Sequence, residues 1–216
     1  MPSVAVHPTA DSATAEATAR RPEKTARILE AGGQLFIEQG FAAASMDQIA
    51  KLAGVSKATV YAHFESKEKL FAAIVYAGCR SNAEDIMSAV AEIDDMREAL
   101  TKIARNIEQF LLSPKVLGIY RVIISEGPRF PDLAKAFYEA GPLPAKLVLS
   151  DYFRRATQKG LLDVPNPRLA AEQLIWLVRG PLYLRRFFNL PHAPEDPTVE
   201  QVIEGAVDTM LKSYGV

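Results

Sequence analysis

The division of this 216-residue chain into helical segments by prolines and glycines is the feature that most constrains its fold. In each segment apolar residues recur three and four positions apart, and no segment alternates apolar and polar residues as a strand would. Proline is favoured in the first turn of a helix and glycine just after its last turn. Pro181 is an exception, because it lies inside a long apolar segment and is expected to kink a helix there. The sequence therefore predicts an all-α fold.

The same pattern of prolines and glycines, together with local composition, divides the chain into three parts. Residues 1–21 are rich in Ala, Thr, Ser and Pro and are expected to form a disordered arm. A small helical domain should follow over residues 22–68, and a larger one over residues 69–216. The expected helices cover residues 22–39, 45–53, 57–64, 67–90, 95–112, 115–126, 131–140, 144–159, 166–188 and 197–214.

Composition fits a protein of a reducing compartment. Hydrophobic residues make up 49% of the chain and charged residues 24%, with a formal net charge of −1. The lone Cys79 allows no intrachain disulfide, and its apolar helical surroundings favour a packing thiol over a redox sensor. No apolar run reaches the roughly 20 residues of a membrane span, and the N-terminal residues lack the pattern of a secretion signal. We therefore expect a cytoplasmic protein with no membrane partner.

Residues 45–71, with the sequence SMDQIAKLAGVSKATVYAHFESKEKLF, are expected to form two short helices joined by a tight turn and the start of a third. Ser45 and Gln48 have the spacing of a capping box, Gly54 supplies the turn, and Ser56 caps the second helix. Five apolar residues are expected to form a small core with the preceding helix: Ile49, Leu52, Val55, Val60 and Phe64. Such a unit typically inserts its second helix into the DNA major groove. The alternative is an amphipathic helical hairpin with a solvated face.

The charge distribution agrees with contact to DNA. Residues 20–69 carry eight basic and six acidic side chains, which leaves a net charge of −3 on the rest of the chain. Lys67 lies in the first turn of the next helix, where its charge and the helix N-terminus both favour a phosphate. Arg20 and Arg21 belong either to a solvated linker or to an arm that reaches a neighbouring groove.

Residues 23–71 resemble the N-terminal domain of the TetR family of transcriptional regulators, through residues 28–41, 45–56 and 61–71. The resemblance implies that Thr59 and Tyr61 contact the DNA backbone, that His63 lies against the strand and that Lys67 binds a phosphate. It also implies a set of residues that approach the DNA: Ser45, Ser56, Lys57, Ala58, Thr59, Tyr61, Ala62, His63 and Lys67.

Three features depart from the family pattern. Ala62 is too small to read a base by hydrogen bonding, although it can contact a thymine methyl group. Met46 and Asp47 replace residues that make polar or basic contacts in some relatives, and Gly32 and Gly33 replace alanines. Close approach by another helix would explain Gly32, whereas the sequence offers no reason for Gly33.

Residues 121–142 and 170–188 resemble the AefR-type C-terminal domain of TetR-like repressors. The resemblance implies a small-molecule pocket and a four-helix dimer interface formed by the last two long helices. The pocket candidates are mostly apolar, with Asn106, Arg121 and Trp176 as polar groups. They are Phe71, Val75, Ile103, Asn106, Ile107, Phe110, Tyr120, Arg121, Ile124, Phe137, Leu147 and Trp176.

The helix expected over residues 166–188 is apolar around most of its circumference, which requires burial on several sides. A subunit interface would provide this burial, and the alternative is an interior helix of a monomer. The predicted interface residues are Leu174, Val178, Leu182, Tyr183 and Phe187. A two-fold dimer would place its recognition helices about 34 Å apart and would require a palindromic operator.

The function predicted from these features is a dimeric DNA-binding repressor that a small, largely apolar effector releases from its operator. A DNA-binding protein without an effector is the first alternative. An all-α enzyme is disfavoured, because His7, His63 and His192 are scattered and the sequence offers no set of metal ligands and no nucleophile beside a base. We therefore predict no cofactor and no metal.

Overall fold

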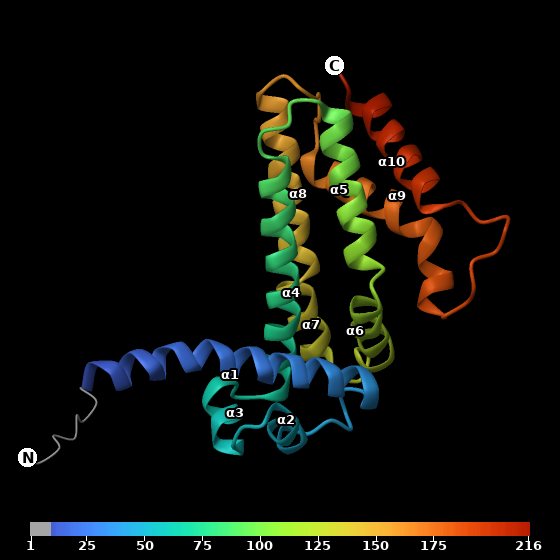
Figure 1. The fold of residues 1–216 in the computed structure, drawn as a ribbon. Helices are drawn as coiled ribbons and strands as arrows, with labels where there is room; N and C mark the ends of the chain where they lie inside the picture. The colour runs from blue at the N-terminus through green and yellow to red at the C-terminus, as the bar shows by residue number, and fades with distance from the viewer. Residues whose placement is uncertain (1–9) are drawn as a thin grey trace, which may run out of the picture. The chain divides into compact units, whose positions relative to one another are not determined.

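The computed structural model describes the backbone from residue 10 onward and the side chains from residue 22, and residues 1–9 lie outside this description (Figure 1). The described part is helical apart from one isolated bridge between Leu162 and Gly215, which confirms the all-α prediction. The helices are α1 (Ala10–Gln39), α2 (Met46–Ala53), α3 (Lys57–His63), α4 (Lys67–Val90), α5 (Met96–Leu111), α6 (Pro114–Glu126), α7 (Pro131–Ala140), α8 (Pro142–Gln158), α9 (Pro167–Phe187) and α10 (Val199–Tyr214).

The chain forms two compact units, Met1–Ile74 and Val75–Val216. Their boundary falls inside α4, so this helix belongs to the first unit at its start and to the second unit for the rest of its length. Each unit has its own buried residues and is considered separately below.

Three phenylalanines lie at the centre of the first unit. Phe36, Phe41 and Phe71 are fully buried or nearly so, and their ring centroids are 5.4–5.9 Å apart. Edge-to-face and tilted contacts of this kind stabilise a core beyond simple burial of area. They join the end of α1, the loop after it and the start of α4.

Helix α2 packs on this core through a face that differs in part from the predicted one. Its buried residues are Met46, Ile49, Ala50 and Ala53, which follow the helical repeat. Leu52 lies off this stripe and is 48% exposed, so its predicted place in the small core is wrong. Val60 of α3 is fully buried, as expected.

The two glycines of α1 have different surroundings. A Cβ atom on Gly32 would lie 3.0 Å from Ile74 Cδ1 and 3.3 Å from Leu70 Cδ2, so α4 approaches α1 too closely for a larger residue without some shift. A Cβ atom on Gly33 would meet only Ile74 Cγ2 at 3.6 Å, an ordinary contact. Close approach therefore explains Gly32, and the packing gives no reason for Gly33.

Helix α1 begins earlier than the sequence indicates. It starts at Ala10 and contains Pro22, so the predicted helix start at Pro22 is wrong. Residues 10–21 include several alanines, two arginines and a glutamate, which are good helix formers. Their propensity offsets the hydrogen bond that Pro22 removes. The rest of the predicted arm lies outside the described residues.

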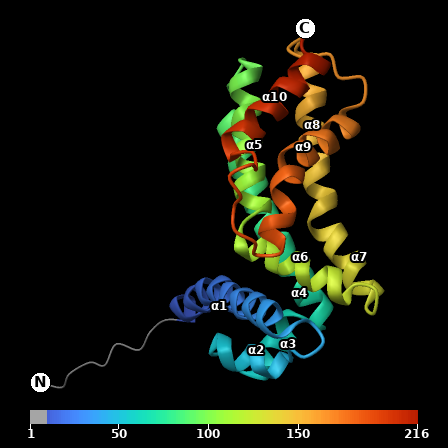
Figure 2. The ribbon, with the colours of Figure 1, turned by 90° about the vertical axis from the view of Figure 1, so that its right-hand side faces the viewer.

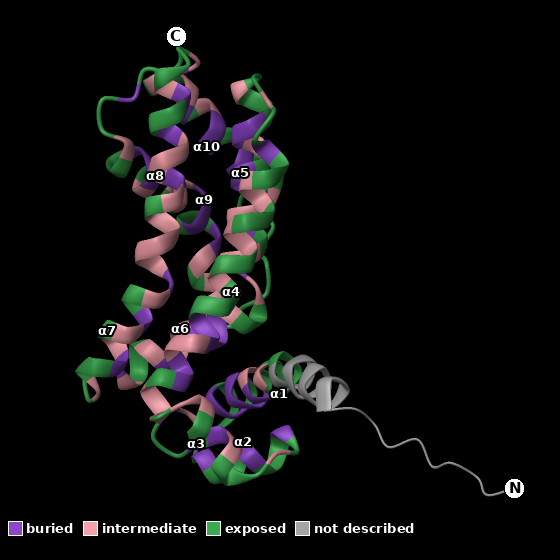
Figure 3. Cartoon of the chain, turned by 90° about the vertical axis from the view of Figure 1, so that its left-hand side faces the viewer, coloured by how far each residue is buried: buried purple, intermediate pink, exposed green. Residues whose placement is uncertain are grey.

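The second unit is a bundle in which α9 packs against α5, α8 and α10 (Figures 1 and 2). The sides of these helices that face one another carry the buried residues, and their outer sides are exposed (Figure 3). Fully buried members of this core include Leu100 and Ile103 of α5, Phe153 of α8, and Leu174 and Val178 of α9. Pro181 lies within α9, as predicted, and the helix continues through it to Phe187.

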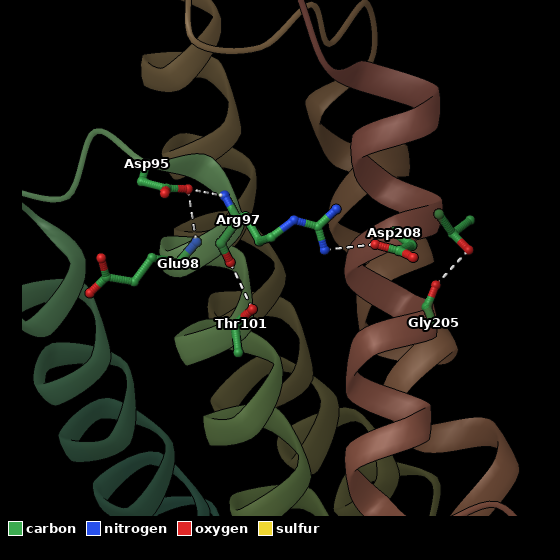
Figure 4. A network of polar contacts seen from close by, with 7 residues as sticks. Asp95, Arg97, Glu98, Thr101, Gly205 and Asp208 are labelled. Atoms are coloured by element: carbon green, nitrogen blue, oxygen red, sulfur yellow. Dashed lines mark hydrogen bonds and ion pairs between the residues drawn. The ribbon is translucent and has the colours of Figure 1, made fainter.

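Polar contacts fix the position of α10 in the bundle. The Asp95 carboxylate caps α5 by accepting from the amides of Arg97 and Glu98 at 2.8 and 3.2 Å (Figure 4). The Arg97 side chain reaches across to Asp208 of α10, with an N–O distance of 2.7 Å (Figure 4). At the C-terminal end of α10, the Tyr214 carbonyl accepts from the amide of Asp163 at 2.8 Å.

Candidate nucleic-acid interface

The turn between α2 and α3 is built by the capping residues that the sequence indicates. The Ser45 amide donates to Gln48 Oε1 at 2.9 Å and the Gln48 amide donates to Ser45 Oγ at 3.2 Å, which completes the capping box. Gly54 ends α2 with a φ of 64°, a left-handed conformation that glycine adopts without strain. Ser56 then accepts from the Thr59 amide at 3.1 Å and starts α3. The helix-turn-helix geometry is therefore encoded locally.

The solvent face of α3 carries the residues expected to approach DNA. Lys57, Ala58, Tyr61 and Ala62 are exposed, and Val60 on the opposite face is buried. Ser45 and Ser56 are also exposed, although their hydroxyl groups serve as caps. A surface on which two small residues, Ala58 and Ala62, lie beside a lysine and a tyrosine can approach a groove closely.

Lys57, at the start of this face, is held by an acidic neighbour. Its ammonium lies 2.8 Å from a carboxylate oxygen of Asp47 on α2, and 5.8 Å from the centre of the Tyr61 ring. The hydrogen bond and charge of Asp47 raise the pKa of Lys57 above its ordinary value. Lys57, which is predicted to approach the DNA, is therefore paired within the unit, a contact that the sequence analysis did not anticipate.

Thr59 and His63 are half-buried rather than fully turned outward. The Thr59 hydroxyl lies 2.8 Å from Ser56 Oγ, and His63 Nδ1 lies 3.2 Å from Thr25 Oγ1 of α1. Both side chains therefore help to fix α3, and their predicted contacts with the DNA backbone remain predictions.

Lys67 makes contacts within the first unit that the sequence analysis did not anticipate. Its ammonium donates to the carbonyls of Phe41, Ala42 and Ala44 at 2.5, 3.2 and 2.9 Å. It also lies 4.5 Å from the centre of the Phe41 ring. An ammonium group has three protons, and these three carbonyls use all of them. In this structure Lys67 therefore ties the α1–α2 loop to α4, and its phosphate contact stays a prediction.

The predicted pocket residues are distributed over both units and differ in their burial. Phe71 belongs to the core of the first unit, and Ile103 is buried in the core of the second. Ile124, Leu147 and Trp176 are exposed on α6, α8 and α9. The remaining apolar candidates are buried or half-buried: Val75, Ile107, Phe110, Tyr120 and Phe137. Tyr120 and Phe137 do meet, edge to face, with a centroid distance of 5.2 Å.

Two of the predicted polar pocket residues form hydrogen bonds to other residues of the second unit. Asn106 and Asn82 exchange two side-chain hydrogen bonds of 3.0 Å between α5 and α4. Arg121 donates to the carbonyls of Phe187 and Arg186 at 2.8 and 3.0 Å and to Asn189 Oδ1 at 3.0 Å. Arg121 thus caps the C-terminal end of α9, where a positive charge is favourable, and its role in a pocket stays a prediction.

The predicted dimer residues are also used within the protomer. Leu174 and Val178 are fully buried in the main core of the second unit, and Leu182 is buried in a smaller cluster. Tyr183 and Phe187 are half-buried against that cluster. Leu174, Val178 and Leu182 are therefore covered within the protomer itself, and the predicted subunit interface stays a prediction.

The opposite face of α9 is apolar and exposed. Leu169, Trp176 and Leu184 are 50%, 54% and 61% exposed, and their spacing places them along one side of the helix together with Gly180. On α10, Gly205, Thr209 and Ser213 form a stripe of small exposed residues. A surface cavity of about 350 Å³ lies between the two helices, lined by Gln173, Trp176, Leu177, Thr209, Met210, Ser213 and Tyr214.

Two features are absent from the described residues. None of their helices is long and apolar enough to cross a membrane. Nor do they contain a group of three His, Cys, Asp or Glu side chains placed to hold a metal ion.

Comparison with known proteins matches both units to one family. Residues 28–74 match the bacterial regulatory proteins of the tetR family, and residues 98–216 match the C-terminal domain of AefR-like transcriptional repressors. The alignments to the first curated relatives span only 36–42% of the length of those proteins. The uncharacterized HTH-type transcriptional regulator Rv2912c of Mycobacterium tuberculosis is 42% identical over 179 residues, which cover 72% of this chain and 91% of that protein.

Solved structures agree with this match. A protein of Mesorhizobium loti described as a TetR-family transcriptional regulator superposes with a TM-score of 0.78 at 30% identity, over 91% of this chain and 99% of the other. The flavonoid-responsive regulator FrrA superposes with a TM-score of 0.70 at 39% identity, over 90% and 98%. The family consists of transcriptional regulators, which are not enzymes. With a family model that covers more than half of the sequence, the chain belongs to the TetR family.

Proposed function

We propose that this protein is a dimeric repressor that binds a palindromic DNA operator and is released from it by a small, largely apolar effector. The observation that carries the DNA-binding part is the solvent face of α3, which a capped turn holds in the geometry of a recognition helix. Repression is the role named for the family of its C-terminal domain.

Tyr61 provides the test of DNA binding. It is 45% exposed on α3, and Tyr138 on α7 is exposed to nearly the same degree and serves as a matched control. DNA fragments selected by the protein from its own genome would be used to measure affinity. Tyr61→Ala should weaken binding about tenfold, as loss of one phosphate hydrogen bond predicts, and Tyr138→Ala should not. Equal affinities of Tyr61→Ala and the unaltered protein would contradict this use of α3.

A second copy of the chain is the proposed occupant of the exposed face of α9 and α10. Gly180 on α9 and Gly205 on α10 have no atom within 4 Å of a Cβ built on them, although glycine costs each helix about 1 kcal/mol relative to alanine. Gly32 shows within the first unit that such a glycine permits close helix approach. The large exposed apolar side chains beside Gly180 would be covered by the same contact.

Sedimentation velocity tests this interface. Leu184→Glu places an unpaired charge in the proposed contact and should convert the dimer to a monomer. Ile124→Glu, at a similarly exposed position on α6, should leave the dimer intact. Dissociation by Ile124→Glu alone would assign the interface to another face.

The second unit is the proposed effector domain. Two observations support this proposal: its relative FrrA is named as flavonoid-responsive, and Tyr120 and Phe137 bring two aromatic rings together within this unit. A compound that stabilises the protein against heat and also releases the operator would support an effector response. If none of a broad set of aromatic and aliphatic compounds does both, the protein binds DNA without an effector, which is the alternative function.

A further inference from the structure

Arg179 of α9 is a buried cation whose charge is not neutralised within the described part of the chain. Its side chain is only 7% exposed, and Nε is buried without a hydrogen-bond partner. No carboxylate of the described residues forms an ion pair with it. The other buried charged residue, Glu108, is paired with Arg186 at 2.7 Å.

Three aromatic rings enclose the Arg179 guanidinium. Its central carbon lies 3.9 Å from the ring centre of Tyr183, 4.3 Å from that of Tyr120 and 5.1 Å from that of Trp176. Ring faces attract the cation but provide no acceptor for its N–H groups. The buried Nε of Arg179 therefore lacks an acceptor, although a side-chain hydrogen bond with Tyr120 contributes weakly to the pKa of that hydroxyl. A carboxylate accepts from two N–H groups of a guanidinium at once, and so would satisfy Nε and a neighbouring N–H.

The groups beside Arg179 supply no negative charge. Burial raises the pKa of the Tyr120 hydroxyl, and the positive charge of Arg179 only partly opposes this effect. Burial also raises the pKa of the nearby Cys79 thiol, to about 11, so the thiol is protonated at neutral pH. Phe137 lies against Tyr120 and adds a further ring to this aromatic cluster.

We propose that Arg179 is the anion-binding group of the effector site and that the effector is an apolar, preferably aromatic, carboxylate. The carboxylate would accept from the guanidinium edge, and the apolar body would lie among the rings of α6, α7 and α9. This inference rests on the proposed effector response and names the chemical class of the ligand.

Trp176 makes the proposal measurable, because it is the one tryptophan of the chain and lies beside Arg179. The probes are benzoate, 4-phenylbenzoate and octanoate, each compared with its uncharged amide, with tryptophan fluorescence and melting temperature measured on the full-length protein without DNA. At least one carboxylate should bind at least tenfold more tightly than its amide. If no carboxylate binds at millimolar concentration, or if the amides bind equally well, the proposal is overturned.

Three variants test whether Arg179 is the group that gives the preference for a carboxylate over its amide. Arg179→Met removes the unpaired charge at similar volume, so it should stay folded by circular dichroism and lose the tenfold preference. Arg179→Lys should keep part of the preference. Arg155→Met, which removes an exposed arginine of α8 that pairs with Asp151, should keep all of it. A preference that survives in Arg179→Met overturns the proposal.

Binding to the selected DNA fragment is measured separately, and this measurement distinguishes failure of the carboxylate proposal from failure of the proposed effector response. A carboxylate that binds through Arg179 without releasing the selected DNA fragment refutes the effector role, and with it the assignment of Arg179 to an effector site. If only uncharged compounds release the DNA, the proposed effector response is supported, and the proposal that the effector is a carboxylate is refuted.

Discussion

The replacement of Lys67 by methionine distinguishes two roles for this residue. In the structure its ammonium binds three carbonyls of the α1–α2 loop, at Phe41, Ala42 and Ala44. Methionine preserves most of the length and the apolar stem of the side chain but supplies no donor. The first unit should therefore lose stability.

The magnitude follows from the burial of the acceptors. The hydrogen bonds to Phe41 and Ala44 are partly buried, and a bond to a charged donor contributes about 1.5 kcal/mol or more. The bond to Ala42 is exposed, so water replaces it at little cost. The expected loss is roughly 3 kcal/mol, a substantial fraction of the stability of a small domain.

Denaturant unfolding, with hydrogen exchange across residues 40–53, measures this loss. Lys69→Met is the matched control, because Lys69 is an exposed lysine of the same helix turn paired only with Glu65 at the surface. DNA affinity of Lys67→Met should fall because the loop is less ordered, while its dependence on salt should keep the same slope. A stable Lys67→Met variant whose salt slope falls by about 0.9 would refute the loop role and support a direct phosphate contact.

Three further predictions concern single side chains. Gly33→Ala should stabilise α1 by about 1 kcal/mol in the same unfolding assay, because the new methyl group meets only an ordinary contact, whereas Gly32→Ala should gain less or lose stability against Ile74 and Leu70. A pKa near 11 for Cys79, against 9.0 for the free thiol, leaves about a hundredfold less thiolate near pH 8. Native Cys79 should therefore react with a thiol reagent about a hundredfold more slowly than Cys79 of the unfolded chain. The reaction rate of native Cys79 should keep rising up to about pH 11. Asp47→Asn should free Lys57 and increase the affinity for non-specific DNA, with a steeper salt slope in a titration; an unchanged slope would show that Lys57 does not reach phosphate.

Helix ends were predictable from the sequence because capping is local. Ser45 with Gln48, Gly54 and Ser56 act on residues one turn away, and the structure contains each of these caps. Proline and glycine likewise give the bounds of α5 to α8 to within about two residues. The start of α1 was missed because Pro22 was taken as a helix start, although the helix continues through it.

The residues that a given side chain contacts in the folded protein were not predictable in the same way. Periodicity shows that Leu174 and Val178 are buried, but the same pattern serves a protomer core and a subunit interface. A lysine in the first turn of a helix also looks the same whether it binds phosphate or, like Lys67, a loop of its own domain. The isolated charge of Arg179 depends on residues from α6 and α9 that meet only in the folded bundle.

The cap at the end of α9 restricts how this region can change in evolution. Asn189 has a φ of 55°, in the left-handed region, and its side chain accepts from Arg121 at 3.0 Å. Glycine at position 189 would adopt the left-handed backbone conformation without strain but would offer Arg121 no side-chain acceptor. A longer side chain with an acceptor could bind Arg121, but it would strain the backbone in this conformation. Asparagine and aspartate meet both demands. Relatives that keep the arginine should therefore keep one of these two residues at position 189, while relatives that have lost it should drift towards glycine there.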